Sequence, residues 1–236
     1  MLNKKDDLGY NQIWEDRVVT RIRADRRNNL FVEKIRRHPS GKILEIGCGS
    51  GFNAYQLALK TGQEVLAIDI CEQFIAHAKK TYSLPNLRYE HRNFHHFDDF
   101  EGESFNFVVG DGILHHLYHQ LDSSFSKIKK LLKPDGRILF LEPNIENPFA
   151  FCLFTLAFMR KWALLDPDEM AFSKRWIGKR LTQNGFNQID IQYRDFLVPN
   201  TPNALINMVV STSNFLEKVP GIKRWSQSIF IDATVF

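Results

Sequence analysis

A glycine-rich stretch that directly follows a short apolar run limits the folds open to this chain. Residues 44–51 read LEIGCGSG, with Gly47, Gly49 and Gly51 at alternate positions. Glycine is needed where the backbone takes a positive φ angle or where a ligand approaches the main chain closely. A strand that runs through such a loop into a helix places bare amides at the carboxyl edge of a parallel sheet, where α/β folds bind ligands. The stretch therefore predicts a ligand site at that edge.

The rest of the chain alternates between apolar strand patterns and amphipathic helix patterns. Strands are expected at 42–47, 64–69, 87–94, 105–112, 137–142, 188–198 and 228–236. Helices are expected over 13–37, across 120–132 and over 171–184. Two more are expected after the first two strands, one ending at about residue 61 and the other at about residue 82. This alternation is typical of a parallel sheet covered on both faces. The predicted fold class is α/β, with a Rossmann-like, seven-stranded, mostly parallel sheet and helices on both of its faces.

Residues 1–40 carry the whole excess of positive charge. They hold 10 Lys and Arg against 6 Asp and Glu, whereas the remaining residues hold 21 of each. We expect this segment to form an N-terminal helical extension whose arginines mostly face solvent, at positions 17, 21, 23, 26 and 27. The neutral body lacks the basic stripe that a broad nucleic-acid footprint needs, so no nucleic-acid partner is expected.

Residues 41–236 are predicted to form one domain with two lid inserts, at about 145–170 and 199–227. The first insert contains NPFAFCLFTLAFM at 147–159, which is too apolar for an ordinary surface loop and too short to span a membrane. The second contains an apolar helix near 203–217. These inserts either cover an acceptor, or pack on each other or across a homodimer.

The spacing of the glycines narrows the class of ligand. It is G-x-G-x-G rather than the G-x-G-x-x-G of dinucleotide enzymes, and no G-K-[ST] follows it, so a nicotinamide cofactor and ATP are both disfavoured. Asp69 ends the second predicted strand, eighteen residues after Gly51. A carboxylate at that place can accept hydrogen bonds from both hydroxyls of a ribose.

Residues 45–51 have the form acidic-x-Gly-x-Gly-x-Gly, and here the chain resembles the class I S-adenosylmethionine-dependent methyltransferases. The resemblance extends over roughly 40–144, through VVGDGILHHL at 108–117 and LLKPDGRILFLEPN at 131–144. EPNIENP and VPGIKRWSQSIFI further resemble the methyltransferase type 11-like branch that acts on small molecules, lipids or quinone precursors. An enzyme is expected, with S-adenosylmethionine as cofactor and S-adenosylhomocysteine as product.

The resemblance also implies which residues bind the cofactor. The three glycines of the loop would line its methionine portion, Asp69 would hold the ribose and Ile70 would pack on the adenine. Asn93 and Phe94 stand where the family usually has an acidic residue that contacts the adenine amino group. The complete set of expected cofactor-binding residues is Glu45, Gly47, Gly49, Gly51, Asp69, Ile70, Asn93, Phe94 and Gly110.

Methyl transfer is an in-line displacement, so the protein mainly aligns the reactants, excludes water and removes a proton where the acceptor carries one. The expected catalytic bases are Asp111, His115 and His116, beside the methyl site. His115 and His119 stand four residues apart on a helix, as two metal ligands can. No third ligand follows in a clear pattern, so no metal site is predicted.

The fourth predicted strand ends in GDGI rather than in the N/D-P-P-Y turn used to methylate base amines. We therefore expect O- or C-methylation of a small apolar or lipid-like acceptor held beneath the inserts. A nucleic-acid or protein methyltransferase and a non-catalytic binding module are the alternatives. Cysteines 48, 71 and 152 form no C-x-x-C pair, and no signal peptide or membrane span is evident, which favours a cytoplasmic protein. The apolar inserts add the expectation of peripheral membrane contact.

Overall fold

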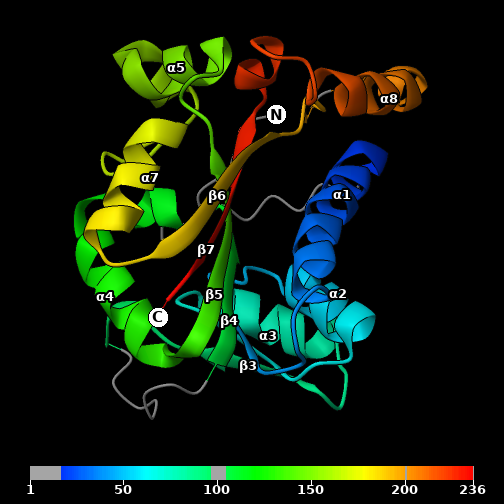
Figure 1. Ribbon diagram of the computed structural model, residues 1–236. Coiled ribbons are helices and arrows are strands. Elements are labelled where there is room, and N and C mark those ends of the chain that lie inside the picture. Colours follow the sequence, from blue (N-terminus) through cyan, green and yellow to red (C-terminus); the bar gives the residue numbers. More distant parts are fainter. Residues whose placement is uncertain (1–16, 97–104, 200, 236) are drawn as a thin grey trace.

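The computed structural model describes residues 17–96, 105–199 and 201–235 (Figure 1). The start of the helix predicted over 13–37, and the last residue of the strand predicted over 228–236, lie outside these residues. The strands are β1 (Ile43–Ile46), β2 (Val65–Asp69), β3 (Leu87–His91), β4 (Phe105–Asp111), β5 (Leu132–Pro143), β6 (Asn187–Arg194) and β7 (Ser228–Thr234).

The helices follow the predicted order. They are α1 (Val18–Ile35), α2 (Phe52–Thr61), α3 (Glu72–Thr81), α4 (Leu121–Leu131), α5 (Pro148–Thr155), α6 (Ala157–Trp162), α7 (Lys174–Gln183) and α8 (Ile206–Leu216). Short 3-10 helices are η1 (Phe94–His96), η2 (Leu114–Gln120), η3 (Asn203–Leu205) and η4 (Ile222–Trp225).

The strands form one seven-stranded sheet in the order β3-β2-β1-β4-β5-β7-β6. The pairs β1–β2, β2–β3, β1–β4 and β4–β5 are parallel. β7 runs opposite to the other six strands of the sheet and pairs antiparallel with both β5 and β6. The predicted Rossmann-like, mostly parallel sheet is confirmed.

Helices cover both faces of this sheet, and each face has its own apolar core. On one face, α4 and α7 pack Phe125 and Ile177 against the sheet. On the other, α1, α2 and α3 contribute Phe31, Leu57 and Ile75. Because it is covered on both sides, central strand β1 is buried at every position, and this includes Glu45.

Three strand boundaries differ from the prediction for local reasons. β3 ends at His91 instead of residue 94, since Phe94 already begins η1. β6 ends at Arg194 instead of residue 198, since Asp195 takes a positive φ of 72°. β5 begins at Leu132 rather than residue 137, and its pairing with β4 contains a register shift between Phe105 and Phe107.

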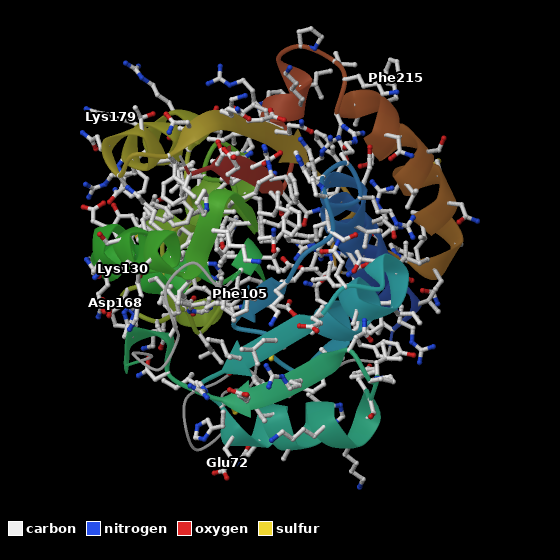
Figure 2. The ribbon with its side chains drawn as sticks, turned by 60° about the horizontal axis from the view of Figure 1, so that its bottom comes forward. Glu72, Phe105, Lys130, Asp168, Lys179 and Phe215 are labelled. Atoms are coloured by element: carbon white, nitrogen blue, oxygen red, sulfur yellow. The ribbon has the colours of Figure 1, made fainter. Side chains whose placement is uncertain are left out.

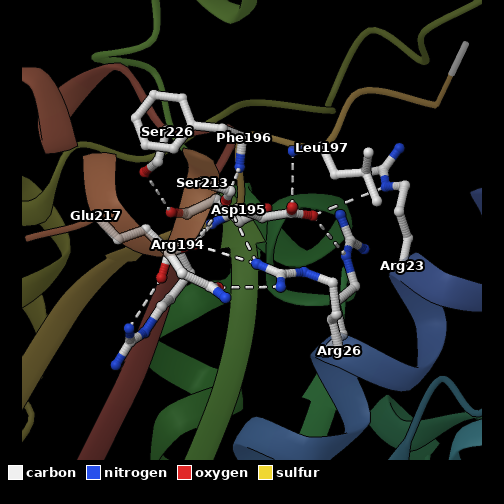
Figure 3. A network of polar contacts seen from close by, with 12 residues as sticks. Arg23, Arg26, Arg194, Asp195, Phe196, Leu197, Ser213, Glu217 and Ser226 are labelled. Atoms are coloured by element: carbon white, nitrogen blue, oxygen red, sulfur yellow. Dashed lines mark hydrogen bonds and ion pairs between the residues drawn. The ribbon is translucent and has the colours of Figure 1, made fainter. Parts of the chain in front are cut away.

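The expectation that the arginines of α1 mostly face solvent is wrong for three of them. Arg23 lies 3.8 Å from Asp195 and Arg26 lies 3.5 Å from Glu217 (Figure 3). Arg27 pairs with Asp111 at 3.0 Å and also faces Asp195 at 3.8 Å. These ion pairs fasten α1 to the end of β4 and to the segment that follows β6.

The two inserts begin at the carboxyl ends of β5 and β6 and gather at one end of the molecule (Figure 1). Asn144 joins them, because its side-chain amide donates to the carbonyls of Arg224 and Ser226 at 2.9 and 2.8 Å. Asn147 caps α5 by accepting from the Ala150 amide at 2.9 Å. None of the described helices is long and apolar enough to cross a membrane.

Candidate active site

The glycine loop lies between β1 and α2, and its conformation requires glycine. Gly47, Gly49 and Gly51 have φ angles of 68°, 53° and 88°. A Cβ at Gly51 would stand 2.6 Å from the Ala78 side chain and 2.7 Å from the Tyr89 ring, so this position is closed by packing. A Cβ at Gly49 would meet no described atom within 4 Å. The loop therefore leaves open backbone at Gly49.

Asp69 ends β2 directly beside this loop. Its carboxylate accepts from the Gly49 amide and from the Cys71 amide, each at 2.8 Å. Burial raises the pKa of the Asp69 carboxyl, and the backbone amides that it accepts from oppose this shift. A carboxylate has about four acceptor positions, so Asp69 keeps capacity for ligand hydroxyls after holding the loop.

A cavity of about 480 Å³ opens at the carboxyl ends of β1, β2 and β4, and we call it the cofactor cavity. Its volume lies within the range of roughly 300 to 1,000 Å³ typical of small-molecule sites. Among the predicted site residues, its wall contains Gly47, Gly49, Asp69, Ile70, Asn93, Phe94 and His116. Glu45, Gly51, Gly110, Asp111 and His115 lie outside that wall.

Glu45 and Gly110 lie beneath the loop. Glu45 is buried and accepts from the Asn53 side chain at 2.6 Å, while its other oxygen has no partner among the described residues. Burial raises the pKa of Glu45 to about 8. A Cβ at Gly110 would stand 2.6 Å from Ile113 and 2.9 Å from Phe140, so this glycine allows close packing. Direct contact of Glu45 or Gly110 with the cofactor stays a prediction.

The opposite part of the cavity wall is formed by Asn93 and Phe94, after β3. The Asn93 side-chain oxygen accepts from the His95 amide at 2.9 Å, which fixes the orientation of the side chain. Phe94 is buried, with the Lys127 ammonium 5.8 Å from its ring centre. Ile70 is 44% exposed and lines the same cavity, so an apolar surface is available for a flat ring.

Asp111 and His115, two of the three predicted bases, have fixed partners. Asp111 is paired with Arg27. Burial of the Arg27 guanidinium lowers its pKa, but the charge of the Asp111 carboxylate opposes this effect, and the pKa of Arg27 lies above its usual value. His115 Nδ1 lies 2.8 Å from the Glu142 carboxylate, and the imidazole Cε1 would stand 3.4 Å from a Cβ on Gly112, which lines the cavity. The role of Asp111 as a base stays a prediction. Its ion pair with Arg27 also connects the end of β4 to α1.

Glu142, which sequence reasoning missed, organises this part of the site. It is buried at the end of β5, and its oxygens accept from the amides of Ile113 and Leu114 at 3.0 and 2.7 Å. Its Oε2 atom also accepts from the His115 amide at 3.3 Å and lies 2.8 Å from His115 Nδ1. The sequence feature that could have indicated this role is the position of Glu142 near the end of the fifth strand, which pairs with the fourth strand.

His116 lines the cofactor cavity itself. Its Nδ1 lies 3.2 Å from the Glu169 carboxylate, and the two imidazole rings of His115 and His116 are 4.1 Å apart. The pairing of His115 and His119 as metal ligands that the sequence raised is not formed. His119 lies 3.4 Å from Asp168, whereas His115 faces Glu142.

Known proteins share the family and the fold. Residues 43–136 match the family described as methyltransferase domain. A demethylmenaquinone methyltransferase from Chlorobaculum parvum is 31% identical over 158 residues, covering 66% of this chain and 60% of that protein. The polyketide synthase-nonribosomal peptide synthetase ACE1 from Pyricularia oryzae is 26% identical over 208 residues, covering 81% of this chain and 5% of that protein.

The solved structures agree on the fold. The crystal structure of an S-adenosylmethionine-dependent methyltransferase from Mesorhizobium loti has a TM-score of 0.63 at 16% identity, covering 88% of this chain and 97% of that one. Residues 43–136 therefore carry the methyltransferase-domain match, and the chain shares the fold of solved S-adenosylmethionine-dependent methyltransferases. It spans 60% or less of the length of the two curated relatives above.

S-adenosylmethionine, the cofactor of this class, fits the residues of the cavity. Open backbone at Gly49 leaves room for close approach, and Asp69 keeps acceptor positions for ribose hydroxyls. Ile70 and Phe94 offer apolar surface to the adenine. The buried Glu45 oxygen that lacks a partner among the described residues is a further polar atom below the loop.

Proposed function

We propose that this chain transfers a methyl group from S-adenosylmethionine to an oxygen or carbon atom of a small apolar or lipid-like acceptor. The observation that carries the proposal is the apolar surface of the two inserts at the carboxyl edge of the sheet. Large side chains there are between 40% and 70% exposed, namely Phe149, Phe151, Leu156, Phe158, Trp162, Met208, Phe215 and Trp225. Figure 2 shows Phe215 projecting outward from α8.

The cofactor supplies an activated methyl group on its sulfonium, and His115 is placed to remove the acceptor proton. An ionised carboxylate only accepts hydrogen bonds, so we assign the Nδ1 proton to the imidazole, donated to Glu142. Nε2 is then the basic nitrogen. Glu142 also favours the imidazolium that forms when Nε2 takes a proton. The domain that performs this chemistry is proposed to span residues 41–236, with 1–40 as its extension.

The test of this proposal is a methyl-transfer assay with labelled S-adenosylmethionine. We expect labelled product with quinols, phenols or lipid extracts, and none with RNA or protein substrates. The demethylmenaquinone methyltransferase among the relatives supports a quinone-type acceptor. Labelled RNA or protein would replace the proposal by the macromolecular alternative. Tight cofactor binding without any product would favour a non-catalytic binding module.

An apolar acceptor dissolved in a bilayer requires the inserts to reach the membrane surface, so we expect reversible binding to vesicles. Each large side chain that inserts stabilises association by roughly 1.5 to 3 kcal/mol. Because Arg23, Arg26 and Arg27 are engaged in ion pairs, exposed Lys161 and Lys218 on the inserts supply the nearby cations. Binding should therefore weaken at high salt.

Flotation with anionic vesicles measures this binding. The double change Phe151→Ser and Phe158→Ser should lower the floating fraction more than tenfold, because two exposed anchors are lost. Phe154 is unsuitable for this test, since it is buried in the core between α5 and Ala171. The matched control is Leu59→Ser, which removes an exposed apolar side chain on α2 and should leave flotation unchanged. If the unaltered protein never floats, the acceptor is a soluble metabolite.

A further inference from the structure

Three side chains with metal-binding atoms meet at the rim of the cofactor cavity. His116, Asp166 and Glu169 each offer one ligand atom, and these atoms all lie within 4.8 Å of one another. All three residues line the cavity. We infer that they form a binding site for one divalent first-row transition-metal ion, such as Mn²⁺, Co²⁺ or Zn²⁺. The sequence predicted no such site, since His116 is separated from the carboxylates by about fifty residues.

The donor set suits this class of ion. One imidazole nitrogen and two carboxylate oxygens are the ligands on which Zn²⁺, Mn²⁺ and related ions are commonly bound, and no soft sulfur donor is among them. Ligand atoms bound at about 2.0 to 2.2 Å from an ion stand roughly 3 to 4 Å apart. His116 Nδ1 and Glu169 Oε1 already have a separation of 3.2 Å. The Asp166 carboxylate has to move only slightly to complete the set.

The loop that carries the two carboxylates is held in place by Arg160. The Arg160 guanidinium donates to the carbonyls of Asp166, Pro167 and Glu169 at 2.6, 3.0 and 3.0 Å. The same guanidinium donates to the carbonyl of Phe154 in α5, which anchors the loop to the first insert. The Glu169 amide closes a turn onto the Asp166 carbonyl at 3.1 Å. Both carboxylates are therefore presented from a constrained backbone.

A second connection fixes this loop relative to His116. The Met170 amide donates to the carbonyl of His115 at 3.4 Å, so the residues after the loop are joined to η2. Behind it, the rings of Tyr118 and Phe172 stack on Trp176 at centre distances of 5.2 and 5.6 Å. Preorganised ligands lose less conformational freedom when they bind an ion, and this favours a defined site over a loose acidic surface.

The burial of the ligands also suits an ion. The Glu169 side chain is only 5% exposed, whereas His116 is 38% exposed and faces the cavity. A divalent ion bound between the three ligands would carry the charge opposite to that of the two carboxylates. The open coordination positions of the ion would face the cavity. The inference concerns metal binding alone and is independent of the identity of the acceptor.

The experiment uses the full chain, treated with chelator and dialysed, without cofactor or acceptor. Titration with Mn²⁺ is followed by loss of the free-ion electron paramagnetic resonance signal. We expect one ion bound per chain, and His116→Ala should weaken binding more than about tenfold. The matched control is His119→Ala, an exposed histidine on the same 3-10 helix, which should leave the affinity unchanged.

Two further variants separate a built site from general negative charge. Arg160→Lys should weaken Mn²⁺ binding while far-ultraviolet circular dichroism stays unchanged, because a lysine cannot bridge the same set of carbonyls. Asp168→Asn removes a neighbouring exposed charge and should have little effect. A binding stoichiometry near zero, or equal weakening by His116→Ala and His119→Ala, would overturn the inference. Since no cofactor is present, either result leaves the proposed methyl transfer intact.

Discussion

Replacing His115 by alanine is expected to lower the rate of methyl transfer by about 10²- to 10⁴-fold, the usual effect of removing a general base. The imidazole is held by the Glu142 carboxylate at 2.8 Å, and its edge lies against Gly112 at the cavity wall. Because His115 does not line the cofactor cavity itself, the affinity for S-adenosylhomocysteine should be unchanged. Initial rates and calorimetry on the same preparation measure both quantities.

Glu142→Gln is the accompanying variant. It keeps the size of the side chain but removes the charge that orients His115 and stabilises its protonated form. We expect a smaller loss of rate than for His115→Ala, because the imidazole stays in the site without the carboxylate that holds it. If His115→Ala keeps the unaltered rate, the base assignment is wrong. His116, which lines the cavity directly, would then be the next candidate.

Replacing Asp69 by alanine is expected to weaken S-adenosylhomocysteine binding by about 1 to 3 kcal/mol, which is roughly 5- to 150-fold in affinity. Two effects contribute to the loss. The acceptor for the ribose hydroxyls disappears, and the Gly49 amide loses the oxygen that fixes the glycine loop. Isothermal titration calorimetry measures the affinity of each variant.

Asp69→Asn is the control for shape, since it keeps an accepting oxygen but lacks the charge. It should bind with intermediate affinity. Thermal unfolding of both variants shows whether the loop and the neighbouring turn at Cys71 stay folded, because the same carboxylate also accepts from that amide. Unchanged affinity in a folded Asp69→Ala protein would refute the assignment of this residue to the ribose.

Most of the sheet could be predicted because its central strands are buried on both faces and are short, mostly apolar runs. The ILEI run of β1 and the glycine loop after it are local signals that nothing distant alters. Strand ends were less accurate where a single backbone angle decides them. At Asp195 a positive φ of 72° ends β6, and nothing in the apolar pattern indicates it.

The parts of the site that were missed depend on contacts between distant residues. Arg23 and Arg27 read as solvent-facing on one helix, yet both approach Asp195, about 170 positions away. Glu142 is a polar residue that ends an apolar strand, and its role appears only when β5 lies beside the end of β4. Likewise, His116 and Glu169 meet only after the first insert folds back.

A crystal structure of this protein with S-adenosylhomocysteine tests the central claim most directly. We predict one ligand per chain in the cofactor cavity, with its ribose hydroxyls donating to the Asp69 carboxylate. Its amino-acid portion should lie along the open backbone at Gly49, and its adenine between Ile70 and Phe94. An empty cavity at saturating ligand concentration, or a ligand bound elsewhere on the chain, would contradict the account.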